Sequence, residues 1–81
     1  MKTQFIEKKD LTDMVEVITL AIVHLQTEEH FFQRSADGTT NESAKTLFVE
    51  ITEALGSCRK ILETKHQMLM RMLVSPESFR E

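Results

Sequence analysis

The sequence predicts an all-α protein: a long antiparallel two-helix hairpin whose four-helix bundle is completed by a second copy of the chain. Three observations predict this fold class. Apolar residues recur three and four residues apart over two long segments, no segment alternates as strands do, and only a few residues connect the two segments. A connection this short makes the two helices antiparallel neighbours. The chain of 81 residues is expected to form a single domain, 1–81.

The first helix is expected at about residues 10–37. Asp10 is its predicted N-cap, Asp13 would be favoured in the first turn by the helix dipole, and Gly38 would end the helix in a left-handed conformation. The predicted inner stripe of this helix includes one carboxylate, Glu28, between apolar positions. The apolar members of the stripe are Leu11, Met14, Ile18, Ala21, Leu25, Phe32 and Ala36.

The second helix is expected at about residues 41–74. Thr39 and Glu42 have the spacing of a capping box at its start, and Asn41 is an alternative cap. Lys65 interrupts its apolar stripe. The apolar members of this stripe are Leu47, Ile51, Ala54, Leu55, Cys58, Ile61, Leu62, Leu69 and Met72.

Two further features of this half of the chain concern its backbone. Gly56 is expected on the side of the second helix away from the stripe, where a glycine costs roughly 1 kcal/mol relative to alanine. The sequence SPES predicts a new cap followed by a short C-terminal turn at 75–81, with Pro76 at its first position.

A hairpin of this length has no closed core, because each helix covers only one side of the other. Val17, Leu20 and Phe31 widen the apolar surface of the first helix beyond what one neighbour can cover. We expect these residues, together with Met68 and Met72, to form an interface in a homo-oligomer, either a dimer or a larger ring.

Composition excludes several classes of partner. The net charge is −3 and the ten basic residues are scattered, so no basic surface for nucleic acid is expected. The longest apolar run, Met14–Leu25, is too short to span a bilayer and contains Glu16 and His24. The start of the chain lacks the apolar region of a signal peptide, and Cys58 has no cysteine to pair with. We therefore expect a cytoplasmic protein without nucleic-acid or membrane partners.

The segment FFQRSADGTTNESAKTLFVEITEALGSCRKIL resembles the ferritin-like superfamily, particularly its rubrerythrin-like and encapsulated-ferritin hairpins. The shared features are an aromatic pair near the end of the first helix, a short polar loop, and a K-x-L-F pattern that opens the second helix. The resemblance covers roughly residues 14–66. The residues that carry it are Phe31, Phe32, Lys45, Leu47 and Phe48.

The resemblance implies a bundle with a di-iron site, in which a glutamate of the first helix and a Glu-x-x-His of the second bind the metal. Laid onto this sequence, those ligands fall at or beside Leu25, Leu55 and Cys58. Iron in such sites needs carboxylate and imidazole ligands, which leucine cannot replace. The resemblance therefore implies a bundle that has lost its usual di-iron ligands.

A relocated metal site is the alternative. His24 and Glu28 are four residues apart and could reach one ion, with Glu50 of the second helix completing an iron site across a two-fold axis. The other interpretation is that Glu28 bonds to a basic side chain or water while His24 packs at the flank. We favour this second interpretation because no third ligand has convincing spacing. Glu29 and His30 are expected to be solvated.

The remaining chemical signals favour packing over catalysis. Cys58 is expected on the core face as a small hydrophobe, and the Lys65 stem is expected to cover apolar surface while its ammonium reaches water. The sequence has no glycine-rich phosphate loop, nucleophile elbow or Cys-x-x-Cys. The expected function is therefore that of a structural or interaction module rather than an enzyme, with an iron-binding or iron-oxidising protein as the alternative.

Overall fold

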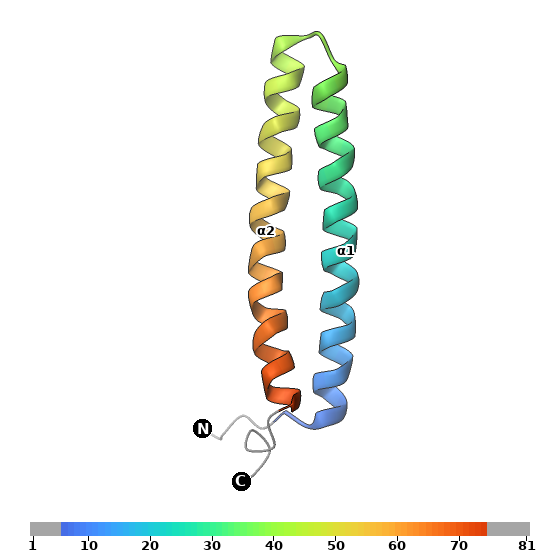
Figure 1. The fold of residues 1–81 in the computed structure, drawn as a ribbon, viewed down its shortest axis with the longest axis vertical. Helices are drawn as coiled ribbons and strands as arrows, with labels where there is room; N and C mark the ends of the chain where they lie inside the picture. The colour runs from blue at the N-terminus through green and yellow to red at the C-terminus, as the bar shows by residue number, and fades with distance from the viewer. Residues whose placement is uncertain (1–5, 75–81) are drawn as a thin grey trace.

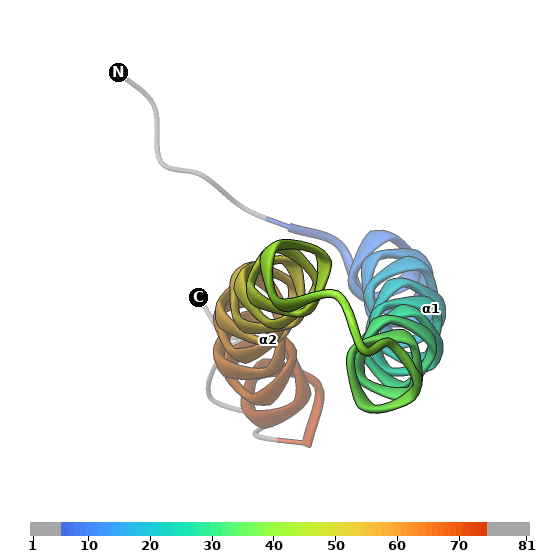
Figure 2. The same cartoon turned by 90° about the horizontal axis from the view of Figure 1, so that it is seen from above.

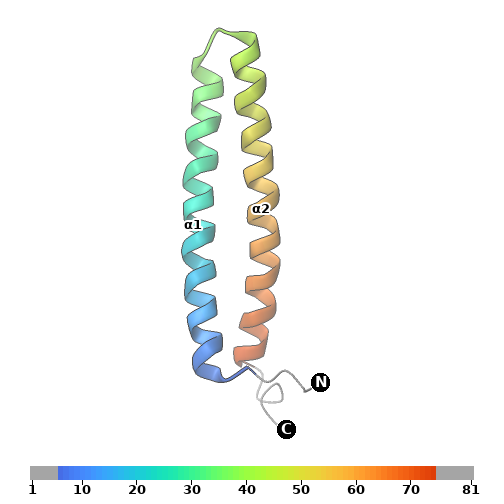
Figure 3. The ribbon, with the colours of Figure 1, turned by 180° about the vertical axis from the view of Figure 1, so that it is seen from behind.

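The computed structural model describes residues 6–74 of the chain and shows the expected helical hairpin. Helix α1 spans Lys8–Gly38 and helix α2 spans Glu42–Val74. The two helices run antiparallel and side by side over their whole length (Figures 1 and 3). Viewed from above, each helix is covered by the other on one side only (Figure 2). The predicted C-terminal turn at 75–81 lies outside the described residues.

The start of α1 differs from the prediction. The helix begins two residues earlier, its N-cap is Glu7 with extended backbone, and Asp10 lies in the first turn instead of capping the helix. The amide of Leu11 donates to the carbonyl of Glu7 at 2.9 Å, which closes the first turn. Asp10 still favours this end of the helix, because a carboxylate in the first turn interacts well with the helix dipole.

The connection between the helices consists of residues 39–41. Gly38 is the last residue of α1, but no glycine within 6–74 has a positive φ, so the predicted left-handed ending was wrong. Thr39 follows with extended backbone at φ −99° and turns the chain out of the helix. The short loop therefore forms without a residue of positive φ, and Thr39, a β-branched residue, makes the turn.

Asn41 is the cap of α2. Its Oδ1 accepts a hydrogen bond from the amide of Ala44 at 2.9 Å, and its backbone carbonyl accepts from the amide of Lys45 at 2.9 Å. The hydroxyl of Thr39 accepts from the amide of Asn41 at 3.1 Å, which orders the loop ahead of the cap. The alternative cap named from the sequence is thus the one that forms.

The contact between the helices follows a strict pattern. Its residues are buried or half-buried and alternate three and four positions apart, as in an antiparallel coiled coil. We call this contact the seam. On α1 it contains Leu11, Val15, Ile18, Ile22, Leu25, Glu29, Phe32 and Ala36, and on α2 it contains Phe48, Thr52, Leu55, Arg59, Leu62, His66, Leu69 and Leu73.

Few side chains of the seam are fully buried. Within residues 6–74, the only fully buried hydrophobic side chains are Leu11, Ala36 and Leu69. Leu11 near the start of α1 and Leu69 near the end of α2 lie at the open end of the hairpin, and Ala36 lies near the loop. Near the loop the rings of Phe32 and Phe48 pack with centroids 6.1 Å apart. Small domains with so little buried surface commonly gain the rest of their stability from partner subunits.

Candidate functional site

A cluster of charged side chains crosses the middle of the seam. Arg59 of α2 donates to both carboxylate oxygens of Glu29 on α1, through Nε to Oε2 and through Nη2 to Oε1 at 3.2 Å. Its Nη1 donates to Oε2 of Glu63 one turn further along α2 at 2.8 Å. The side chains of Glu29 and Arg59 are only 18% and 21% exposed, so this bidentate pair is partly shielded from water.

The local sequence makes room for this ion pair. A Cβ added at Gly56 would lie 3.4 Å from Oε1 of Glu29, so the glycine leaves space beside the carboxylate. The hydrogen bond from Arg59 lowers the pKa of Glu29 below its ordinary value of 4.5, against the opposing effect of burial. The hydrogen bonds from Glu29 and Glu63 in turn raise the pKa of Arg59. Both partners therefore stay charged at neutral pH.

These residues correct the sequence prediction. Glu29, expected to be solvated, lies in the seam, while Glu28, expected in the inner stripe, is exposed. Gly56 was placed on the side away from the packing, but it is half-buried beside Glu29. Arg59 was not singled out at all. Its signal was its spacing in α2, because Arg59 continues the three-and-four-residue pattern between Leu55 and Leu62.

A second polar contact crosses the seam nearer its open end. Nε2 of His66 lies 3.0 Å from the hydroxyl oxygen of Thr19. Together with Glu29 and Arg59, this contact fixes the register of the two helices: Thr19 is level with His66, and Glu29 is level with Gly56. Polar contacts of this kind specify one alignment in a seam whose apolar residues would pack in several.

The two broad sides of the hairpin differ in character. On one side, Gln26, His30 and Gln33 of α1 lie beside Thr52 and Arg59 of α2. We call this side the polar face. The other side carries apolar residues along most of both helices, and we call it the apolar face. Its apolar members are Met14, Val17, Ala21 and Phe31 of α1 and Leu47, Ile51, Ala54, Cys58, Ile61, Met68 and Met72 of α2.

The apolar face is largely open to solvent. Val17 is 66% exposed, Ile61 is 61% exposed and Phe31 is 56% exposed. Phe31 packs edge-on against Phe32, with ring centroids 5.3 Å apart, so the face continues directly into the seam. His24 and Glu28 of α1 and Lys65 of α2 are the charged or titratable residues within this face, and all three are exposed.

The predicted interface residues do not all share one side. Val17, Phe31, Met68 and Met72 belong to the apolar face. Leu20, although 60% exposed, lines a shallow hollow with Val15, Glu16 and Thr19, whereas Val17 lines another with Asp13, Met14 and Ile18. Leu20 therefore lies on the outer side of α1, away from α2, and does not belong to the apolar face.

The candidate metal ligands are not brought together within one chain. His24, Glu28 and Glu50 are all exposed. Glu29, the neighbour of Glu28, is level with Gly56. Glu50 lies six residues nearer the loop than Gly56, which is about 9 Å along the helix axis at ~1.5 Å per residue. Glu50 is therefore far from Glu28 in the same chain. Between Ile6 and Val74, no group of three or more His, Cys, Asp or Glu side chains is arranged to hold a metal ion.

The positions where the family resemblance places di-iron ligands have two different environments. Leu25 and Leu55 are half-buried in the seam, where they supply packing. Cys58 is exposed, so its predicted position on the core face was wrong. The reason is that Cys58 lies one helical position outside the seam, between Leu55 and Arg59, and so belongs to the apolar face.

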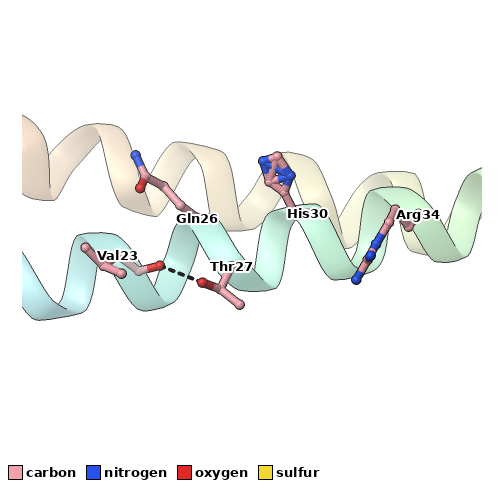
Figure 4. Close-up of a pocket in the computed structure, with 5 residues that line it drawn as sticks. All are labelled: Val23, Gln26, Thr27, His30 and Arg34. Atoms are coloured by element: carbon pink, nitrogen blue, oxygen red, sulfur yellow. Dashed lines mark hydrogen bonds between the residues drawn. The ribbon is translucent and has the colours of Figure 1, made fainter.

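Hollows on the surface offer no convergent site. One of about 360 Å³ is lined by Val23, Gln26, Thr27, His30 and Arg34, all of which come from α1 (Figure 4). The hydroxyl of Thr27 is used locally, because it donates to the carbonyl of Val23 at 3.1 Å. A neighbouring hollow is lined by Gln26, Glu29, His30 and Arg59, whose two charged members already bind each other.

Comparisons with known proteins add no family assignment. The chain matched no protein-family model, no curated protein and no solved structure. Among the described residues, neither helix has an apolar stretch long enough to cross a membrane. The apolar face is thus the feature of this structure from which function can be argued.

Proposed function

We propose that this chain is a structural or interaction module that associates with further copies of itself into a helical bundle. The apolar face carries this proposal. The seam takes up only one stripe of each helix, while a second stripe on each helix stays exposed on the same side of the hairpin. Exposed apolar surface that is continuous over two elements is characteristic of protein interfaces.

The face is large enough to support association. Complete burial of one large apolar side chain contributes roughly 1.5–3 kcal/mol, so covering the exposed half of one contributes about 1 kcal/mol. Val17, Phe31, Leu47, Ile61 and Met68 are each between 42% and 66% exposed. Two copies would together contribute on the order of 10 kcal/mol from these residues alone, which is comparable with the ~4–15 kcal/mol cost of association.

The resemblance to ferritin-like hairpins fits this proposal without adding a metal function to it. A ferritin-like bundle is assembled from hairpins of this form, and Leu25 and Leu55 occupy the positions where that resemblance places iron ligands. We propose a bundle of ferritin-like form that acts through protein contacts, with no intact di-iron site.

Molar mass in solution tests the proposal, and two residues of the chain make a matched pair. Val17 and Leu20 are similarly exposed, at 66% and 60%, but only Val17 belongs to the apolar face. We expect the wild-type mass to be a multiple of 9.4 kDa, Val17→Asp to reduce it toward 9.4 kDa, and Leu20→Asp to leave it unchanged. Light scattering on a sizing column measures this, with circular dichroism as a check that each variant stays helical. A wild-type mass of 9.4 kDa at every concentration would rule the proposal out.

Iron binding or oxidation at a subunit interface is the second candidate. It is favoured by one observation: His24 and Glu28, four residues apart, are both exposed on the face that would meet another subunit. Glu50 would have to be supplied by the other copy. Iron content after anaerobic ferrous loading and gel filtration tests this candidate, which predicts about one iron per subunit or per pair.

The control variant for iron binding lies on the same helix. Glu28→Ala should abolish iron retention if this site exists, while Glu16→Ala, which changes an exposed glutamate beside Leu20, should not. If wild type retains no iron, the protein-interaction proposal stands alone.

A further inference from the structure

The apolar face also indicates how two copies fit together. We infer that the second copy packs face to face and antiparallel, with its loop at the opposite end, about a two-fold axis that crosses α1 at Gln26 and α2 between Arg59 and Lys60. The inference rests on the proposed self-association and specifies its geometry. In this arrangement α1 lies on α1 of the second copy and α2 lies on α2.

The apolar residues of α2 determine the position of this axis. They extend from Leu47 to Met72, and a second α2 running in the opposite direction covers them completely only when these two end residues meet. Ile51 then lies opposite Met68, and Cys58 lies opposite Ile61. The midpoint of all three pairs falls between Arg59 and Lys60. Any shift along the axis would leave apolar side chains exposed at both ends.

The register of the hairpin transfers this midpoint to α1. Because Thr19 is level with His66 and Glu29 with Gly56, Gln26 is level with Arg59. Gln26 is also midway between His24 and Glu28. The midpoint between Arg59 and Lys60 therefore falls half a residue, or about 0.75 Å, from the level of Gln26. An axis through Gln26 puts His24 of each copy opposite Glu28 of the other.

The same axis sets Phe31 and the lysine of the face opposite small side chains, and it sets Val17 opposite Ser35 and Met14 opposite Gly38. Phe31 lies opposite Ala21 of the second copy, which pairs a large side chain with a small one. Lys65 lies opposite Ala54, whose small side chain leaves space for the lysine stem to reach the edge of the interface. Each charged group of the face thus has either an opposite partner or a path to water.

The alternative two-fold arrangement lacks this complementarity. If the two loops lay at the same end, α1 of each copy would pack on α2 of the other, with equal levels in contact. His24 would then lie opposite Ile61 and Glu28 opposite Cys58, so each polar group would face an apolar residue. The antiparallel arrangement is therefore the one that the polar side chains of the face favour, because it places His24 opposite Glu28.

Distances between spin labels distinguish the two arrangements. Cys58 is the only cysteine and is exposed, so Cys58→Ser gives a label-free background. In that background Thr40→Cys places a nitroxide in the loop, 14 residues beyond Gln26. Antiparallel packing predicts about 42 Å between the two loops, at ~1.5 Å per residue over 28 residues. A label at Gln26→Cys, level with the axis but on the polar face, is the control and should give a shorter distance, because only the thickness of the bundle separates the two labels.

The results separate this inference from the proposal on which it rests. A dimer with loop labels on the order of 20 Å apart would overturn the antiparallel arrangement and leave self-association intact. A protein that is monomeric at all concentrations would overturn both. The unlabelled Cys58→Ser variant should have the mass of wild type, which shows that the background does not alter assembly.

A charge exchange gives an independent measurement. His24→Glu places a glutamate opposite Glu28 of the second copy and should weaken dimerisation several-fold because like charges then meet. Adding Glu28→His restores a histidine–glutamate pair across the axis and should return the dissociation constant to within about two-fold of wild type. The intrahelical pair between positions 24 and 28 is present in monomer and dimer alike, so it does not produce this pattern. Failure of the second change to restore dimerisation would contradict the inferred axis.

Discussion

The seam between the two helices carries as many charged or histidine side chains as the apolar face of the hairpin: Glu29, Arg59 and His66 against His24, Glu28 and Lys65. The seam contains an ion pair and a histidine at positions that a coiled coil normally fills with apolar residues. The apolar face, which is largely open to solvent in a single chain, carries Leu47, Ile61 and Met68. Alignment and burial are thus divided between two surfaces of the hairpin. The seam sets the register of the helices, and the apolar face holds the surface that remains to be buried.

Substitution of one leucine in each surface tests this difference most directly. Leu69 is 3% exposed in the seam, and Leu47 is 54% exposed on the apolar face. Leu69→Ala should lower the free energy of unfolding by roughly 2–5 kcal/mol at any protein concentration, because it removes packing within the hairpin. Leu47→Ala should cost less than about 1 kcal/mol in dilute protein and progressively more as concentration rises. Urea unfolding at several concentrations measures both, and equal costs at all concentrations would contradict the distinction.

The ion pair provides the next largest expected effect. Arg59→Met leaves the carboxylate of Glu29 partly buried without its cation, and should lower the midpoint of thermal unfolding clearly. Replacing both residues in Glu29→Leu/Arg59→Met should restore the midpoint to that of wild type or higher, because an apolar pair avoids desolvating two charges. If the double variant is less stable than Arg59→Met, the ion pair stabilises the fold by more than is needed to offset the desolvation of its two charges.

The sequence predicted the elements more accurately than their orientation. Both helices lie within a few residues of their expected ends, because helical period and the short loop are local signals. Five apolar seam residues of α1 were correctly included in its inner stripe, namely Leu11, Ile18, Leu25, Phe32 and Ala36. The stripe nevertheless took in Met14, Ala21 and Glu28 in place of Val15, Ile22 and Glu29, each one residue away.

The cause of that error is the second apolar surface. In a helix with one apolar stripe, the spacing of the apolar residues identifies the buried side. Here the seam and the apolar face are adjacent on both helices, so the apolar residues form one wide band. Leu55 and Leu62 belong to the seam, while Cys58 and Ile61 belong to the apolar face. The spacing of these residues does not distinguish the two sets. Only the packed hairpin shows that Glu29 meets Arg59, because this contact depends on the register of two segments 30 residues apart.

The charged cluster of the seam should give the hairpin a dependence on acid. The pKa of Glu29 lies below its ordinary value of 4.5, chiefly because Arg59 donates hydrogen bonds to the carboxylate. Its contribution to stability is therefore fully present above about pH 4.5 and is lost as the pH falls through the lower value in the folded state. Thermal unfolding followed from pH 7 to pH 3 should show a smaller decrease for Glu29→Gln than for wild type. Equal decreases would indicate that other carboxylates cause the acid sensitivity.

The smallest expected effects concern the two glycines, which test how closely the seam fits around its ion pair. A Cβ at Gly38 would have no heavy atom within 4 Å, and its φ is not positive, so Gly38→Ala should stabilise α1 by roughly 0.4–1 kcal/mol. A Cβ at Gly56 would touch Oε1 of Glu29 at 3.4 Å, so part of the similar gain in helix propensity should be offset by displacement of the carboxylate. Urea unfolding of both variants should therefore place Gly38→Ala above Gly56→Ala. If the two gains in stability become equal in a Glu29→Gln background, the ion pair is what restricts position 56. If Gly56→Ala gains as much stability as Gly38→Ala in the wild-type background, the seam has more space around Glu29 than the 3.4 Å contact indicates.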